Sequence, residues 1–88
     1  MNGIIGTENA GYVIIEAMRY NPTTGYCIGR NKNQYVTWWF SETPDGKSVN
    51  FYHGHYFPIN YLTPLKSAAK AKADYCRRLM EAYEYISE

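Results

Sequence analysis

The hydrophobic and polar positions in the first two thirds of the chain form short segments that favour extended structure. These segments are rich in β-branched and aromatic side chains, which pack well on a pleated sheet. They cover residues 12–20, 26–30, 34–41 and 48–56. The stretches between them, NPTTG, NKN and TPDGK, contain the Pro, Gly, Asn and Asp residues that tight turns require. Short turns join neighbouring strands, so we predict an antiparallel meander of four strands.

After residue 62 the pattern changes to the period of an α-helix. Thr63 is a favourable N-cap, and Pro64 suits the first helical position. Apolar or small residues fall on one face of this helix, at positions 65, 69, 76, 79, 83 and 86. Because no Gly or Pro follows, the predicted helix runs from residue 64 to about residue 87. The predicted fold class is therefore α+β, with a four-stranded antiparallel meander sheet packed on one long C-terminal helix.

The length of 88 residues is that of a single domain, and 45% hydrophobic with 19% charged residues is a globular composition. We expect residues 1–88 to form this one domain, with the sheet at about 12–56 and the helix at about 64–87. Residues 1–10 contain two glycines and show little periodicity. They predict a loosely ordered start to the chain.

The strand at 34–41 should present alternate side chains to opposite faces of the sheet. One helix covers only one face, and the more apolar set is predicted to lie against it: Val36, Trp38 and Phe40. Tyr35 and Trp39 then lie on the uncovered face, beside Tyr52 of the next strand. An exposed aromatic patch is typical of an interaction surface. These three residues are the predicted partner-binding site.

Charge and aromatic content narrow the classes of partner. The net charge is +1, from nine Lys and Arg against eight Asp and Glu. A duplex DNA binder usually carries a clear basic excess, and a DNA mimic would carry an acidic one. Aromatic residues make up 17% of the chain and include ten tyrosines, whose rings pack while their hydroxyls stay wet. The balance favours a protein partner over a nucleic acid.

The charges of the predicted helix are ordered against the helix dipole. The basic residues of its first half are Lys66, Lys70 and Lys72, and the acidic residues near its end are Glu81, Glu84 and Glu88. A helix dipole favours the opposite order. One interpretation is a solvated face. The alternative is a nucleic-acid-binding surface formed by the basic side of the helix, with Lys66, Lys70, Arg77 and Arg78 as its residues.

Lys72 falls near the middle of the predicted apolar face. We expect its stem to pack there while its ammonium reaches an edge, a Tyr hydroxyl or Glu16.

Candidate chemistry is sparse. His53 and His55 lie two residues apart on a predicted strand and could face one metal, but no third ligand follows at a recognisable spacing. We expect no metal and no cofactor, one imidazole hydrogen-bonded in a structural role, and a bulge or close backbone approach at Gly54. No phosphate-binding loop or nucleophile motif occurs, so we predict that the chain is not an enzyme.

The chain carries no apolar leader after Met1 and no apolar stretch of the ~18 residues that a membrane helix needs. We therefore expect a cytoplasmic protein with no membrane association. Cys27 and Cys76 are expected to be free thiols in a reducing compartment.

Two short motifs suggest a family. The sequence YVTW at 35–38 and the sequence GHYF at 54–57, followed by a closing helix, resemble small uncharacterised domains encoded on conjugative transposons and phages of Gram-positive bacteria. The similarity covers residues 12–80. It implies no established activity and no functional residues, but it implies an accessory protein of a mobile genetic element. It also suggests that the two motif strands are neighbours.

The leading functional prediction is a non-enzymatic protein-binding accessory module of a mobile genetic element. It would act through the face around Tyr35 and Trp39 or through a sheet edge, with a homodimer as one form of that interaction. The second prediction is the nucleic-acid-binding helix. The third and weakest is an enzyme or metal protein built on His53 and His55.

Overall fold

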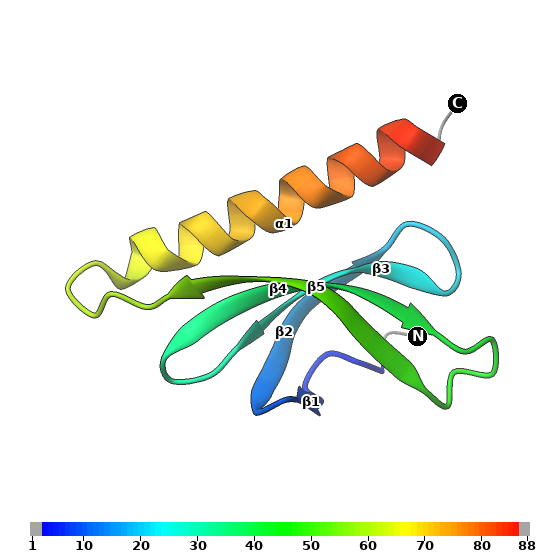
Figure 1. Ribbon diagram of the computed structural model, residues 1–88, viewed down its shortest axis with the longest axis horizontal. Coiled ribbons are helices and arrows are strands. Elements are labelled where there is room, and N and C mark those ends of the chain that lie inside the picture. The colour runs from blue at the N-terminus through cyan, green and yellow to red at the C-terminus, as the bar shows by residue number, and fades with distance from the viewer. Residues whose placement is uncertain (1–2, 87–88) are drawn as a thin grey trace.

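The computed structural model describes residues 3–86, and its elements are those of an α+β meander (Figure 1). The strands and the helix follow in the order β1 (Glu8–Asn9), β2 (Tyr12–Arg19), β3 (Thr24–Arg30), β4 (Gln34–Glu42), β5 (Val49–Pro58) and α1 (Pro64–Ile86). All neighbouring strands are antiparallel, and the sheet order is β1-β2-β3-β4-β5. The predicted fold class is thus confirmed, with one strand more than predicted.

Asparagine side chains close the first two hairpins. The Asn21 carboxamide oxygen accepts hydrogen bonds from two backbone N–H groups at 2.9 and 3.0 Å, and that of Asn31 accepts two more at 2.8 and 2.9 Å. These are the Asx turns that such sequences favour. In the third turn Gly46 has φ = 73°, which few other residues tolerate. The turn residues therefore set the meander locally, as the sequence indicated.

The two motifs lie on neighbouring strands. Tyr35 pairs with Phe57, Val36 with Tyr56, and Thr37 with His55 between β4 and β5. The predicted adjacency of the two motif strands is confirmed.

The first residues of the chain are part of the structure, and the prediction of a loosely ordered start is wrong for residues 3–10. Ile4 is only 4% exposed, β1 pairs with β2, and the Ile14 backbone exchanges two hydrogen bonds with Gly6 and Thr7. A two-residue strand has no detectable period, so the sequence gives no signal for it. Residues 1–2 lie outside the described part.

The sheet is curled, and it buries apolar side chains on both faces. On the concave face one core cluster consists of Ile4, Tyr12, Ile14, Cys27, Val36, Trp38 and Phe40. On the other face α1 covers a second cluster, Ile28, Ala71, Tyr75 and Leu79, with Tyr20, Tyr26, Tyr35 and Phe57 packed around it. In Figure 1, α1 lies on one side of the sheet and β1 on the other.

The prediction that Val36, Trp38 and Phe40 face the helix is therefore wrong. They are buried by the curled sheet and the N-terminal segment, while the alternate set of β4 faces α1. A strongly curled sheet partly encloses its own concave face, so the most apolar face did not require the helix. The idea of an uncovered face around Tyr35 and Trp39 fails for the same reason.

The helix begins at Pro64 as predicted, and the Thr63 carbonyl accepts the N–H groups of Lys66 and Ser67. Its buried stripe is rotated from the predicted one and consists of Ser67, Ala71, Tyr75, Arg78 and Leu79. Of the positions predicted to face inward, Leu79 is buried, while Leu65, Ala69, Cys76 and Tyr83 are exposed. Tyrosine and phenylalanine rings occupy part of the sheet surface beneath α1, and the buried stripe fits around them with both small residues, Ser67 and Ala71, and large ones, Tyr75, Arg78 and Leu79. The side chain of Ile86 and residues 87–88 lie outside the described part.

Candidate protein-binding surface

A β-bulge shapes the centre of β5. Thr37 pairs with His55 and Trp39 with Tyr52, so Trp38 alone faces both His53 and Gly54. His53 has φ = 56°, the left-handed conformation that opens such a bulge. A Cβ on Gly54 would lie 2.9 Å from Trp38 Nε1 and 2.8 Å from the Tyr56 hydroxyl. The predicted bulge and close approach at Gly54 are both confirmed.

Two of the three predicted partner-binding residues lie together. The rings of Trp39 and Tyr52 are 5.2 Å apart, with His53 beside both. Trp39 Nε1 donates to the Tyr20 hydroxyl at 2.7 Å, which ties this ring to the residue that follows β2. Trp39 is half-buried and Tyr52 is 43% exposed. The group is a partly covered aromatic cluster rather than an open platform.

Tyr35 lies elsewhere. Its ring packs against the core beneath α1, and the Arg30 guanidinium stacks 5.4 Å from its centroid. The three residues therefore do not form one patch.

Arg78 is buried, so the prediction that it belongs to an exposed basic surface is wrong. Its guanidinium donates to the Thr37 carbonyl and hydroxyl at 3.1 and 2.9 Å, and to the His53 carbonyl at 2.9 Å. It also lies 4.8 Å from the centroid of the Tyr26 ring. A flexible stem allows Arg to enter a core while its planar head meets several acceptors. Arg78 joins α1 to the bulge.

Asp74 completes this junction. Its Oδ2 accepts from the Thr37 hydroxyl at 2.6 Å and lies 3.0 Å from His55 Nδ1, and Oδ1 accepts from Arg77. Burial alone would raise the pKa of this carboxyl, but the hydrogen bonds from Thr37 and His55 and the nearby Arg77 charge hold it below its usual value. The expected structural, hydrogen-bonded imidazole is His55.

The remaining basic residues of α1 are divided between two environments. Arg77 is exposed but forms ion pairs with Asp74 and, at 3.5 Å, with Glu81. Lys66 and Lys70 are exposed and flank a shallow groove of about 220 Å³ beside Phe57. Two cations without a second binding feature make a weak phosphate-binding surface.

The exposed side of α1 carries an apolar stripe. It consists of Leu65, Ala69, Cys76, Met80 and Tyr83, spaced three, four or seven residues apart on one side of the helix, and we call it the α1 stripe. Leu65 is 84% exposed, Met80 62% and Tyr83 48%. Lys72, which would interrupt the stripe, instead extends to β2, where its Nζ lies 3.0 Å from Glu16 Oε1. This contact was one of the expected alternatives for Lys72.

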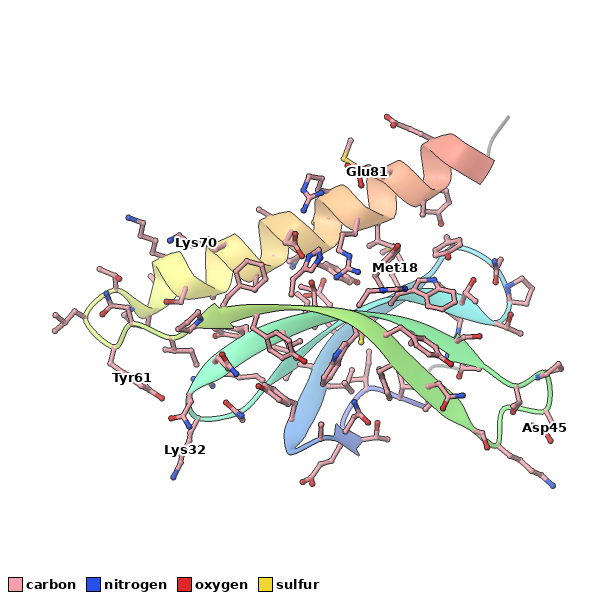
Figure 2. The ribbon with its side chains drawn as sticks, viewed as in Figure 1. Met18, Lys32, Asp45, Tyr61, Lys70 and Glu81 are labelled. Atoms are coloured by element: carbon pink, nitrogen blue, oxygen red, sulfur yellow. The ribbon has the colours of Figure 1, made fainter. Side chains whose placement is uncertain are left out.

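Strand β2 extends this apolar surface. Helix α1 packs on β3, β4 and β5, and exposed apolar side chains remain on β2 at Val13, Ile15 and Met18. A shallow groove of about 370 Å³ lies between the helix and this strand, with Ile15 on one wall and Leu65, Ala68 and Ala69 on the other. Large contiguous apolar patches on a protein surface often mark interaction sites. Figure 2 shows Met18 below α1 and Tyr61 near its start.

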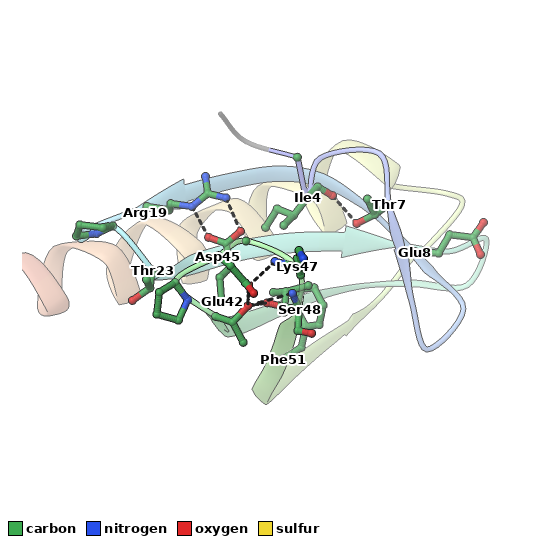
Figure 3. Close-up of a pocket in the computed structure, with 16 residues that line it drawn as sticks. Ile4, Thr7, Glu8, Arg19, Thr23, Glu42, Asp45, Lys47, Ser48 and Phe51 are labelled. Atoms are coloured by element: carbon green, nitrogen blue, oxygen red, sulfur yellow. Dashed lines mark hydrogen bonds and ion pairs between the residues drawn. The ribbon is translucent and has the colours of Figure 1, made fainter.

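The concave face has a larger but open hollow of about 760 Å³ between the N-terminal segment and the turn before β5 (Figure 3). Arg19 and Glu42 lie at this hollow and bind each other through two hydrogen bonds of 2.6 and 2.8 Å. This pairing raises the pKa of Arg19 and lowers that of Glu42. Because the two charges satisfy each other, this pair offers no free charge to a ligand in the hollow.

The cysteines differ in environment. Cys27 is buried, and burial raises the pKa of its thiol to about 12, whereas Cys76 is exposed on the α1 stripe. Within residues 3–86, no three His, Cys, Asp or Glu side chains gather in a way that could hold a metal ion. No helix in this part of the chain is long and apolar enough to cross a membrane.

Comparison of the chain with models of protein families, with curated proteins and with solved structures gave no match. The resemblance to domains of mobile elements therefore stays a prediction.

The sequence pattern contained the α1 stripe but was interpreted as the core face. The charge of Lys72 near the middle of that face is the signal that these positions do not form the core. The exposed row on β2 had no comparable signal, because Val13 and Ile15 resemble ordinary buried strand residues.

Proposed function

We propose that this chain is a non-enzymatic protein-binding module whose α1 stripe packs against an α-helix of a partner protein. The observation that carries the proposal is the exposure of Leu65, Met80 and Tyr83 on a long, regular helix whose own sheet binds a different stripe. Side chains three and four residues apart form the seam that a second helix recognises.

The surroundings of the stripe support a helical partner. Val13 and Ile15 on β2 and the groove beside Leu65 extend the apolar area on one side of α1. On the other side, charged residues of α1 border the stripe and would form the polar rim of the interface. They are Lys66, Lys70, Arg77, Glu81 and Glu84. A role as an accessory protein of a mobile genetic element is part of the proposal and rests on the resemblance carried by the YVTW and GHYF motifs.

The basic side of α1 gives less support to nucleic-acid binding. With Arg78 buried and Arg77 engaged by two carboxylates, Lys66 and Lys70 are the residues of the predicted set that remain for phosphates. In the described part of the chain, the ring contacts of the aromatic cluster at Trp39 are with Tyr52 and His53 and include no Lys or Arg, whereas single strands require a cationic groove beside the rings.

The proposal is tested by comparing a stripe variant with a control variant. Leu65→Ser with Met80→Ser removes two exposed side chains of the stripe, while Ile5→Ser removes an exposed apolar side chain of the N-terminal segment, on the other side of the sheet. Immobilised wild-type protein is used to capture partners from cells that encode it, and each captured protein is then purified and titrated directly.

We expect the stripe variant to weaken binding at least about ten-fold, which corresponds to about 1.4 kcal/mol, and the control to bind like the wild type. Equal affinity for both variants, with both folded by circular dichroism, would contradict the proposal. So would a wild-type chain that binds neither another protein nor itself.

A further inference from the structure

The order of charges along α1 indicates which helix fits the α1 stripe. The first turn of α1 holds no acidic residue and its last turn no basic one, so neither end has the charge that its dipole favours. Lys66 and Lys70 lie in the first half, and Glu81 and Glu84 in the second. Figure 2 shows Lys70 and Glu81 toward opposite ends of the helix. Within one chain, this order is unfavourable.

We propose that the partner is a second copy of this chain, with the two α1 stripes packed antiparallel across a two-fold axis. The inference rests on the protein-binding function proposed above and names its partner. Two copies of one surface can bind each other only if that surface is complementary to itself.

The charges of α1 meet this requirement in the antiparallel orientation. Residue 75 is the midpoint of the helix, and Lys66 and Glu84 each lie nine residues from it. An antiparallel pair centred there places Lys66 opposite Glu84 of the second copy, and Lys70 close to the second copy's Glu81. Each charge then also lies at the end of the neighbouring helix whose dipole attracts it. A parallel pair would instead bring like charges together.

The apolar residues suit the same arrangement. Ala73 and Cys76 flank the midpoint, and their small side chains permit two helix axes to approach within about 8–10 Å. The larger residues Leu65, Met80 and Tyr83 lie farther from the two-fold axis. There they would pack on both sides of the close central contact. Arg77 does not disturb this pattern, because Asp74 of its own chain engages it.

The sheet leaves room for the second helix. The residues beneath α1, Ser67, Ala71 and Tyr75, are on the side of the helix away from Ala69, Ala73 and Cys76. The stacking order would be sheet, helix, helix, sheet. At ~1.5 Å per residue the 23 residues of α1 offer a contact line of roughly 34 Å.

The first measurement is sedimentation equilibrium of the full chain combined with cross-linking. In the proposed dimer the two Cys76 residues face each other near the axis, while Cys27 is buried. We expect a dimer at micromolar concentration and rapid joining of the copies by a short bismaleimide. Cys76→Ser should abolish that cross-link, and Cys27→Ser should leave it unchanged.

The second measurement tests whether dimer formation depends on the order of charges along α1 or is non-specific apolar association. Lys66→Glu with Lys70→Glu makes both halves of α1 acidic, and Glu81→Lys with Glu84→Lys makes both halves basic. We expect each double variant alone to raise the dimer dissociation constant at least about ten-fold. An equimolar mixture of the two should restore wild-type affinity, because every contact in the mixed dimer joins opposite charges.

The outcomes distinguish this inference from the function on which it rests. A chain that stays monomeric at ~100 µM, or a dimer indifferent to both charge variants, overturns the antiparallel homodimer. If that monomer still binds another protein through Leu65 and Met80, the proposed function stands without it. A dimer that persists in Leu65→Ser with Met80→Ser, and whose Cys76 residues do not cross-link, overturns both.

Discussion

Arg78 is the side chain through which α1 is fixed to the sheet. Its guanidinium donates three hydrogen bonds to Thr37 and His53, and two of the acceptors are backbone carbonyls. One of these carbonyls belongs to the left-handed residue of the bulge, so the bulge and the helix position depend on each other. A single arginine thus connects the local irregularity of β5 to the packing of the helix.

We predict that Arg78→Met lowers the free energy of unfolding by about 2–4 kcal/mol, because it leaves buried acceptors without donors. The methionine keeps most of the stem, so the loss reports the guanidinium. Arg77→Met is the matched control, since its ion pairs are exposed, and it should cost less than about 1 kcal/mol. Urea denaturation of both variants measures the difference. Equal losses would mean that the junction at Thr37 and His53 contributes little.

The burial of Arg78 could not be predicted from the sequence, whereas the bulge at Gly54 could. Hydrophobicity patterns place Arg on a surface, and the acceptors of Arg78 are carbonyls whose orientation depends on the bulge. No local sequence signal encodes that arrangement. The bulge itself had a signal, because Gly54 stands inside an otherwise bulky strand.

Among the elements, β4 carries the two tryptophans that face opposite sides of the sheet. Trp38 is buried on the concave face, where its ring packs at 5.4 Å from Tyr12 and 5.2 Å from Phe51. Trp39 is half-buried on the helix side and hydrogen-bonded to Tyr20. Side chains on both faces of β4 therefore contribute to the fold, and Trp38 is more deeply buried than Trp39.

We expect Trp38→Ala to cost about 3–5 kcal/mol or to unfold the domain, as is usual for a buried aromatic ring. Trp39→Ala should cost about 1–2 kcal/mol, since its ring is partly solvated and one hydrogen bond is lost. Thermal and urea unfolding of the two variants supply the comparison. If Trp39→Ala lowers the free energy of unfolding more than Trp38→Ala does, this assignment of the two faces is wrong.

The elements themselves were largely predictable, because turn residues and helix signals act locally. The four predicted strands and the helix start agree with the structure to within about two residues. The packing of those elements was not predictable in the same way. Which face α1 covers depends on the curl of the sheet, and which stripe of α1 is buried depends on the volume left by Tyr20, Tyr26 and Phe57.

At the scale of the whole molecule, the two cores share the same sheet and are closed by different ends of the chain. Helix α1 covers one face, and the N-terminal segment covers part of the other. The N-terminal segment has few residues but closes the apolar centre formed by Val36, Trp38 and Phe40. The outer side of α1 and the row on β2 stay exposed, and the proposed interaction depends on this apolar surface.

The last prediction tests whether the N-terminal segment is part of the fold. Ile4 is 4% exposed and its neighbour Ile5 is 44% exposed, so the two provide a matched pair of substitutions in one segment. Ile4→Ala should lower the free energy of unfolding by about 2–4 kcal/mol through a cavity at the concave core, and Ile5→Ala by about 0.5 kcal/mol or less. Denaturant titrations with unchanged m-values would attribute the difference to the native state. If the two variants are equally stable, Ile4 does not close the core, and the concave face must be counted as a second exposed apolar surface that competes with the α1 stripe for a partner.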